Sequence, residues 1–277
     1  GSATSTSLSF EKGNQYVAAG EDSTFQYDSA YTIEMWVNSD FPVSFSNALI
    51  NYGTSSISDI EIYVQGSSGR LTIVHGRVNG SAQSYFQYPV PVKSSWTHIA
   101  VTYDGREQEI KVYYDGVEQT QFHEYNPTVA LVKREGATLN IGRVFSFNSS
   151  SDSYSGLMDE VRVWDTVRTA QQIADFKDFC LTGEESGLVS YFQFDEGADT
   201  LAVDIAGGNN GILTGMDSET DWTTDTPVSC VGCSMQMSTS VTITVGDEES
   251  PEVLTKDISL VLGESGTAEI TPADIDN

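Results

Sequence analysis

Basic residues are scarce in this sequence. Thirteen lysines and arginines stand against 40 aspartates and glutamates among 277 residues, which gives a formal net charge of −27 at pH 7. Repulsion from phosphate argues against nucleic acid as a partner, and no cluster of Lys and Arg suggests otherwise. The acidity has two interpretations: a well-solvated surface, or carboxylates that hold a hard cation such as calcium, which prefers oxygen ligands.

Long apolar runs are absent as well. No run approaches the length of a membrane span, which argues against membrane insertion. The N-terminus has neither the basic nor the apolar region of a signal peptide. No Ser/His/Asp grouping and no phosphate-binding glycine motif occurs in the sequence. Composition and motifs therefore point away from nucleic-acid-binding, membrane-inserted and motif-bearing enzyme classes.

Cysteine is rare, and its three copies do not form a zinc motif. Cys180, Cys230 and Cys233 fit no Cys/His spacing, because the three histidines lie far apart in sequence. We predict a disulfide between Cys180 and Cys230 that clamps the last large loop of the chain. Pairing of Cys180 with Cys233 is the alternative. Either disulfide implies an oxidising, extracellular setting.

Strand patterns dominate what is present. Residues 31–38, 96–103 and 109–114 alternate between apolar and polar side chains, and Asp-Gly pairs at 104–105 and 115–116 favour hairpin turns. The alternation places Trp36 on the polar side of its strand, either as packing or as a surface that stacks on sugars. Shorter strands are predicted at residues 8–10, 16–18, 48–52, 60–64, 70–75, 84–88 and 188–194.

One helix is predicted, and it starts near Thr169. Thr169 and Gln172 fit a capping box, and Ile173 and Phe176 form an apolar i, i+3 pair. After Cys233 the composition changes and a new alternating pattern begins. We therefore assign residues 1–7 to a tag or linker, 8–233 to one β domain, and 234–277 to a linker and a truncated second β module.

The stretch from Leu139 to Asp165 carries the main functional hypothesis. It consists of an alternating strand, LNIGR, a loop, VFSFNSSSDSYSG, and a second alternating strand, LMDEVRVWD. Two strands joined by an aromatic and polar loop suggest a rigid antiparallel platform with a recognition surface at its rim.

Several fragments, in the right order, resemble the laminin-G-like, concanavalin A-like domains of secreted bacterial multidomain proteins. They are LSFEKGNQYV, YTIEMWV, WTHIAVTYDG, IKVYYDGV, LNIGR, LMDEVRVWDTVRTAQQI and the later block LVSYFQFDEGADTLAVDIAGGNNGILTG. The resemblance implies an all-β, two-sheet antiparallel jelly-roll sandwich with one short helix, in which the later block closes the same sandwich. The last thirty or so residues resemble the opening of an immunoglobulin-like, hyalin-repeat-type module.

The resemblance raises two further questions: whether the domain is catalytic and whether it binds calcium. Related glucanases use a Glu-x-Asp-x-x-Glu strand motif, and here only Asp59-Ile60-Glu61 comes near it, which favours an exposed strand or rim over a catalytic pair. Pentraxins hold calcium with acidic residues after a strand like LNIGR, but this chain has Arg143-Val144-Phe145-Ser146 there. A structural calcium ion is still expected, with oxygen ligands from Glu11, Asn14, Asp159, Asp195, Asp204 and Asn210. The alternative is that these are ordinary turn residues.

The expected function is a non-catalytic, extracellular carbohydrate-binding or adhesion module of a larger secreted or cell-surface protein. Its partners would be a glycan or polysaccharide, or a cell-surface protein. Aromatic side chains stack on sugar rings, while amides, carboxylates and guanidinium groups bind hydroxyl or acidic substituents. The predicted contacts are Arg143, Phe145, Phe147, Asn148, Asp152, Tyr154 and Asp59. The alternatives are a packing loop, a calcium-stabilised spacer domain and an accessory domain of a polysaccharide-degrading enzyme.

Overall fold

The computed structural model describes residues 5–11, 13–21, 25, 27–42, 44–54, 57–78, 81–125, 131, 134–144 and 153–228. The chain divides into two compact units, Gly1–Met235 and Gln236–Asn277. The second unit lies outside the described residues, so the truncated immunoglobulin-like module stays a prediction. In the first unit Thr6 is buried and Ser7 already belongs to the first strand, although both are predicted to lie in a tag or linker.

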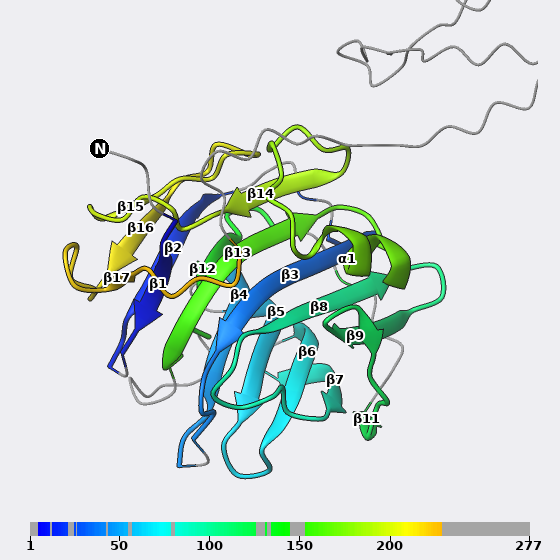
Figure 1. Cartoon of the computed structure of the whole chain (residues 1–277). Helices are drawn as coiled ribbons and strands as arrows, with labels where there is room; N and C mark the ends of the chain where they lie inside the picture. The colour runs from blue at the N-terminus through cyan, green and yellow to red at the C-terminus, as the bar shows by residue number, and fades with distance from the viewer. Residues whose placement is uncertain are drawn as a thin grey trace, which may run out of the picture. The chain divides into compact units, whose positions relative to one another are not determined.

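Two antiparallel sheets build the domain, as predicted (Figure 1). Sheet A runs in the order β10-β9-β8-β3-β13-β1-β17, and β14 also pairs with β13. Its strands are β10 (Val117–Glu118), β9 (Glu109–Tyr114), β8 (Thr97–Asp104), β3 (Ala30–Asn38), β13 (Gly156–Trp164), β1 (Ser7–Phe10), β17 (Trp222–Thr223) and β14 (Leu188–Phe192).

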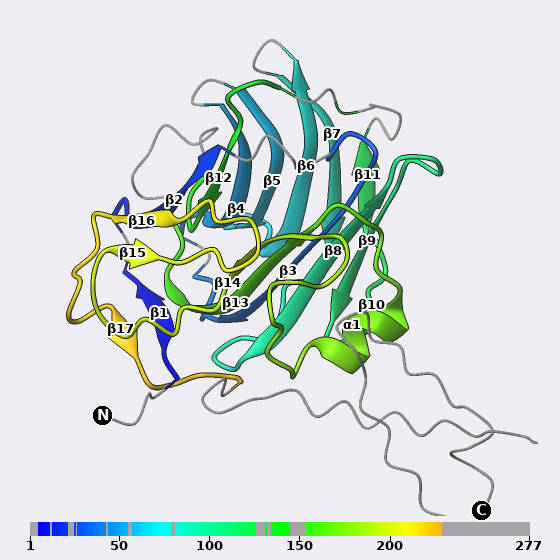
Figure 2. The ribbon, with the colours of Figure 1, turned by 90° about the horizontal axis from the view of Figure 1, so that it is seen from above.

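Sheet B runs in the order β11-β7-β6-β5-β4-β12-β2-β16-β15. Seen from above, strands β4 to β7 bend together, so this sheet is curved (Figure 2). Its strands are β11 (His123–Tyr125), β7 (Ser81–Tyr88), β6 (Arg70–Val78), β5 (Ile57–Gln65), β4 (Asn47–Thr54), β12 (Thr138–Ile141), β2 (Tyr16–Glu21), β16 (Gly211–Thr214) and β15 (Leu201–Ala202).

The core lies between the two sheets and follows the alternation of the strands. Ile33, Met35 and Val37 of β3 are fully buried in it, as their shared face predicts. The hairpin turns are confirmed too. Asp115 and Gly116 have φ values of 51° and 82°, the left-handed conformation that a two-residue hairpin loop between β9 and β10 requires.

The predicted platform of two neighbouring strands is wrong in its pairing. β12, which contains most of LNIGR, pairs with β4 and β2 in sheet B. β13, which contains LMDEVRVW, pairs with β3, β1 and β14 in sheet A. The loop between them therefore crosses from one sheet to the other. Sequence periodicity predicts each strand, but it does not say which sheet the strand joins.

The late block and the helix behave as predicted. β14 joins sheet A, while β15 and β16 extend sheet B beyond β2, so the block closes the same sandwich. Helix α1 (Ala170–Phe176) begins after Thr169, whose side chain forms the capping box with Gln172. Its buried Ile173 packs on the outer face of sheet A, against Ala100 and Tyr113. No helix in the described ranges is long and apolar enough to span a bilayer.

Candidate functional site

One row of facing residues crosses the outer face of sheet B from edge to edge. The residues beside them in the strands, such as Ile60, Ile73 and Phe86, point into the core, so this row points outward. The row consists of Tyr125, Tyr85, Val74, Glu61, Asn51, Asn140, Ala18, Ile212 and Leu201.

Only the two ends of this row are open to a ligand. Glu61 and Asn51 at its centre are fully buried, whereas the side chains of Tyr125 and Ile212 are 52% and 51% exposed. The end that contains Tyr125 lies on β7 and β11, at the edge of the sheet (Figure 2).

Aromatic rings gather at that edge. The rings of Tyr85 and Tyr125 stack, with centroids 5.3 Å apart and planes 18° from parallel. The ring of His123 lies 5.6 Å from that of Tyr85, and the Tyr85 hydroxyl contacts His123 Nε2 at 3.4 Å. Phe122, the residue before the strand, is exposed as well. This concentration of exposed rings suits flat, partly apolar ligands.

Polar groups of defined geometry adjoin the rings. Arg70 Nη1 donates to Gln87 Oε1 at 3.1 Å, and Gln87 Nε2 donates to Gln65 Oε1 at 3.1 Å. The Arg70 guanidinium also lies 5.2 Å from the centroid of the Phe122 ring. We call the group Arg70, Tyr85, Gln87, Phe122, His123 and Tyr125 the aromatic surface. It offers stacking faces, a fixed amide and a fixed cation together.

Sequence reasoning missed this surface. Tyr125 and His123 belong to a strand of three residues, which is too short to show alternation. The register that places Tyr125 beside Tyr85 joins residues 40 positions apart in sequence. The one visible signal was the cluster of Tyr85, Phe86 and Tyr88 in β7.

The predicted loop site is only partly described. Arg143 is half-buried, and its guanidinium lies 4.7 Å from the ring centroid of Tyr16 on β2. Tyr16 shares the outer side of its strand with Ala18, so Arg143 lies near the other edge of sheet B. Four further predicted contacts lie outside the described residues: Phe145, Phe147, Asn148 and Asp152.

The predicted ligand contact of Tyr154 is wrong. Its side chain is fully buried, in an edge-on contact with Phe10 at 5.5 Å. The hydroxyl donates to the carbonyl of Leu157 at 2.8 Å. Tyr154 is thus a core residue at the end of the loop, and its hydroxyl is used to hold the start of β13.

The prediction of an exposed strand or rim for Asp59 and Glu61 is also wrong. Tyr52 faces Ile60 and Gly53 faces Ser58, so Asp59 is the extra residue of a β-bulge. Its side chain is 1% exposed, accepts from Arg134 Nε at 2.7 Å and contacts the hydroxyl of Tyr27 at 3.2 Å. Burial raises the pKa of Asp59, against the lowering effect of Arg134. A ligand contact of Asp59 does not fit this burial.

Two predicted calcium ligands, Asp204 and Asn210, accept backbone amides of a turn. The Asp204 carboxylate accepts the backbone amides of Tyr191 (2.8 Å), Gly207 (3.0 Å) and Asn209 (3.2 Å). Asn210 Oδ1 accepts the amide of Asp204 at 3.0 Å. These oxygens therefore satisfy backbone donors, which is the turn-forming role of Asp and Asn.

The remaining predicted ligands are Glu11, Asn14, Asp159 and Asp195. Burial, followed by the charges of Glu160 and Asp195, raises the pKa of Asp159 well above its usual value. Glu11 is exposed in the β1–β2 loop, where Asn14 takes a φ of 79°. Over the described ranges, no three His, Cys, Asp or Glu side chains come together to hold a metal. Calcium therefore stays a prediction that the described residues do not test.

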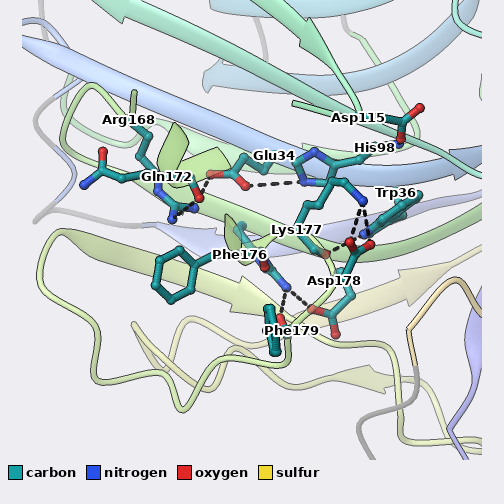
Figure 3. A network of polar contacts seen from close by, with 12 residues as sticks. Glu34, Trp36, His98, Asp115, Arg168, Gln172, Phe176, Lys177, Asp178 and Phe179 are labelled. Atoms are coloured by element: carbon teal, nitrogen blue, oxygen red, sulfur yellow. Dashed lines mark hydrogen bonds and ion pairs between the residues drawn. The ribbon is translucent and has the colours of Figure 1, made fainter. Parts of the chain in front are cut away.

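A network of buried charges lies on the outer face of sheet A, beneath α1 (Figure 3). Glu34 Oε1 accepts from Arg168 Nη1 at 2.6 Å, and Glu34 Oε2 lies 3.3 Å from His98 Nε2. Burial opposes ionisation, but the hydrogen bond from His98 and the charges of His98, Arg168 and Arg162 lower the pKa of Glu34 to about 2. All of these groups are buried, so no substrate reaches them.

The network attaches the segment after α1 to the sheet. Arg162 of β13 is fully buried and donates to the carbonyls of Phe176 (3.0 Å) and Phe179 (2.5 Å). The indole of Trp36 donates to the carbonyl of Lys177 at 2.9 Å and is nearly covered. The packing interpretation of Trp36 therefore holds, and a sugar-stacking role does not.

A shallow cavity of about 400 Å³ lies where the predicted loop enters β13. It is lined by Asn38, Ser39, Asp40, Pro42, Ser94, Ser155, Gly156 and Leu157. Its hydroxyls are largely engaged within the protein: Ser39 Oγ donates to the Ser155 carbonyl at 2.6 Å, and Ser94 Oγ donates to Asp40 at 2.5 Å. This leaves few donors for a ligand.

Cys180 is buried and forms a disulfide. Its partner lies outside the described residues, as do both Cys230 and Cys233. The choice between the two predicted pairings therefore stays open.

Comparison with solved structures finds a similar fold in other proteins. A candidate carbohydrate binding protein from Bacteroides ovatus is similar with a TM-score of 0.59 and 22% identity over 77% of this chain. The match spans 59% of that protein's length. Weaker likenesses are a heptameric SAP-like pentraxin from Limulus polyphemus (TM-score 0.41, 18% identity, 62% of this chain and 81% of that one) and the CBM40 of a Ruminococcus gnavus IT-sialidase bound to α2,3-sialyllactose (0.49, 12%, 61% and 95%).

The sequence comparison is more specific about the family. No curated protein matches the chain. Residues 11–174 match a laminin G family model. That family is described as the concanavalin A-like lectin/glucanases superfamily. Since that match covers more than half of the 277 residues, the chain belongs to the concanavalin A-like lectin/glucanases superfamily.

Proposed function

We propose that this domain binds carbohydrate and that the aromatic surface of sheet B is the site. The observation that carries the proposal is the exposed ring of Tyr125, which stacks on the half-buried ring of Tyr85. Exposed aromatic pairs on a rigid sheet offer apolar faces on which sugar rings stack at little cost in conformational entropy. The amide of Gln87 and the guanidinium of Arg70 lie beside them to bind substituents.

The edge position suits an extended ligand. Five strand spacings of about 4.8 Å, roughly 24 Å, separate β7 from β2 across the sheet. At the far end the Arg143–Tyr16 pair offers a second ring and cation. We propose that this pair and the predicted loop residues Phe145, Phe147, Asn148 and Asp152 form a further contact. A polysaccharide chain, rather than a single sugar, would reach both ends.

The proposed role is binding without catalysis. Of the carboxylates closest to the row, Glu61 is buried and Asp59 is held by Arg134, so neither is placed to transfer a proton to a surface ligand. The disulfide at Cys180 supports an extracellular setting. We therefore propose an adhesive or accessory module of a larger secreted or cell-surface protein.

Binding to a panel of immobilised polysaccharides tests the proposal. Tyr125→Ala should weaken binding about tenfold or more, which corresponds to about 1.4 kcal/mol. Phe179→Ala is the matched control, because Phe179 is a similarly exposed ring (55%) in the segment after α1. Failure of the wild-type domain to bind any polysaccharide would refute the function, and equal loss in both variants would refute the site.

A second assay separates binding from catalysis. The domain is incubated with the polysaccharides that it retains, and soluble products are measured over time. No release above a buffer control is expected. Release that persists in Tyr125→Ala would instead point to an active site elsewhere on the domain.

A further inference from the structure

We infer that the aromatic surface selects polysaccharides that carry carboxylate or sulfate groups, and that Arg70 pairs with the anionic group. The inference rests on the proposed function, because it assigns a ligand class to the same surface. The relevant observation is a cation that is fixed in place, lies beside exposed rings and has no carboxylate partner within the described part of the chain.

The charge balance leaves few cations on this protein. Acidic residues outnumber basic ones by 40 to 13. A carboxylate lies within 4 Å of five cations of the described regions, Arg134, Arg162, Arg168, Lys111 and Lys177. Arg70, like Arg106 and Lys93, forms no ion pair with another described residue. Arg70 has the neutral amide of Gln87 as its polar partner. Its positive charge is therefore not cancelled locally.

The position of the guanidinium leaves donors for a ligand. An arginine carries five N–H donors in a planar fork. One Nη1 donor is used by Gln87, and the Phe122 ring lies over one face. The fork can therefore still offer two parallel donors, a geometry that matches a carboxylate or a sulfate. Because Gln87 is fixed in turn by Gln65, the guanidinium is held in place before the ligand arrives.

The nearest acidic side chain on the edge strand faces the other way. Glu124 lies opposite Phe86, whose side chain enters the core, and its Oε2 accepts from Gln121 Nε2 at 2.8 Å. On its outer side the aromatic surface therefore carries the charge of Arg70 and no carboxylate of β11. Long-range repulsion of a polyanion is screened beyond about 8 to 10 Å at physiological salt, whereas contact with Arg70 is direct.

Matched polysaccharide pairs test the inference. The wild-type domain is compared on polygalacturonate and its methyl-esterified form, and on dextran sulfate and dextran. The first pair tests carboxylate and the second tests sulfate. We expect at least a tenfold preference for the charged member of one pair. Equal binding to both members of both pairs would overturn the inference, while the proposed function would stand.

Variants assign the preference to a residue. Arg70→Gln should abolish it and leave weak binding to the neutral polymer, and Arg70→Lys should keep part of it, because the charge remains and the fork is lost. Arg106→Gln, an exposed arginine in the β8–β9 turn, should change nothing. A preference that survives Arg70→Gln, or falls equally in Arg106→Gln, would overturn the inference.

Salt provides a second readout that does not depend on one variant. The ratio of wild-type to Arg70→Gln affinity for the charged polymer should fall as NaCl rises from 50 to 500 mM, since a contact ion pair at an exposed site is weakened by salt. A ratio that does not change with salt would contradict an ionic contact. If Arg70→Gln proved poorly folded in circular dichroism, the same ratio measured for Arg70→Lys should still exceed one at low salt.

Discussion

The ring of Tyr125 on β11 stacks on that of Tyr85 on β7, 5.3 Å away, with Tyr85 half-buried and Tyr125 exposed. Facing residues of an antiparallel pair place their side chains side by side on one face, so the pairing of β11 with β7 creates this contact. β11 is an edge strand with three exposed residues. Its aromatic content is thus better explained by recognition than by the core.

Truncating Tyr125 should scarcely change stability. Exposed cross-strand pairs contribute about 0.2 to 1 kcal/mol, so Tyr125→Ala should lower the free energy of unfolding by no more than about 1 kcal/mol. Urea unfolding measures this directly. Tyr31→Ala serves as the contrast, because Tyr31 is fully buried and should cost about 3 to 5 kcal/mol. Similar losses in both variants would mean that Tyr125 is a structural residue.

The Asp59–Arg134 pair should matter more for folding than the exposed pairs do. Arg134→Gln leaves the buried carboxylate of Asp59 without its cation, and we expect a loss of about 1 to 3 kcal/mol. The double variant Asp59→Asn, Arg134→Gln should recover part of that loss, because the uncompensated charge is gone.

The control is the exposed Lys111–Glu109 pair, where Lys111→Gln should cost less than about 1 kcal/mol. All four proteins are compared by urea unfolding. A double variant no more stable than Arg134→Gln alone would show that burial of the Asp59 charge is not what Arg134 offsets.

The sequence predicts most strands and the helix cap because these depend on neighbours along the chain. Alternation identifies the buried side of β3, and the capping box of Thr169 and Gln172 closes within three residues. Contacts made over long sequence distances are not predicted in this way. Tyr154 meets Phe10 across 144 positions, and Arg134 reaches Asp59 across 75. Tyr154 and Asp59 therefore look exposed in the sequence but are buried.

In the candidate site, too, contacts over long sequence distances are not predicted from the sequence. The contact of Arg143 with Tyr16 is not predicted from the sequence, and the aromatic surface depends on a three-residue strand that alternation cannot detect. A β-bulge moves Asp59 out of the regular pattern, and one residue of slip is enough to change the side on which a side chain lies. Register and bulges, more than composition, decide which residues meet at the surface.

Removing the disulfide should destabilise the domain. If Cys180 pairs with Cys230, the closed loop holds about 50 residues, and the chain-entropy relation gives about 4 kcal/mol. Cys180→Ser should lower the melting temperature, as should a reducing agent acting on the wild type. Mass spectrometry of peptides from the unreduced protein identifies the partner. A peptide that links Cys180 to Cys233 would replace the pairing that we favour.

His75 should make the domain sensitive to mild acid. Burial lowers the pKa of His75 from 6.5 to about 3, so the folded state favours the neutral ring, which contacts the Tyr31 hydroxyl through Nδ1 at 3.1 Å. Its stabilising contribution is full above pH 6.5 and is lost as the pH falls toward 3. The loss due to His75 should reach roughly 3 kcal/mol at pH 4.

His75→Asn isolates this effect, since the asparagine oxygen can accept the Tyr31 hydroxyl and does not titrate near neutral pH. The variant should be less stable than the wild type at pH 7, and the gap should narrow or reverse by pH 4. Urea unfolding at several pH values measures both proteins. Parallel pH profiles would show that His75 is not the titrating group.

Asp159 should have the opposite pH dependence. Burial and the charges of Glu160 and Asp195 raise its pKa well above 3.8, so the folded state favours the protonated acid. The contribution of this group is fully present below pH 3.8 and is lost as the pH rises through the raised pKa. In the wild type the Glu160 amide donates to Asp159 Oδ1 at 3.0 Å. Asp159→Asn cannot ionise, and its side-chain oxygen can still accept this amide.

The variant should therefore gain stability relative to the wild type as the pH rises from 4 to 8, by about 1 to 3 kcal/mol at the upper end. Glu107→Gln, in the exposed β8–β9 turn, controls for the change in net charge. If Asp159 instead held a cation, Asp159→Asn would be less stable than the wild type at pH 8 when calcium is present, and EDTA would remove the difference. Unfolding curves at pH 4, 6 and 8, each with calcium and with EDTA, thus test the raised pKa and the calcium prediction together.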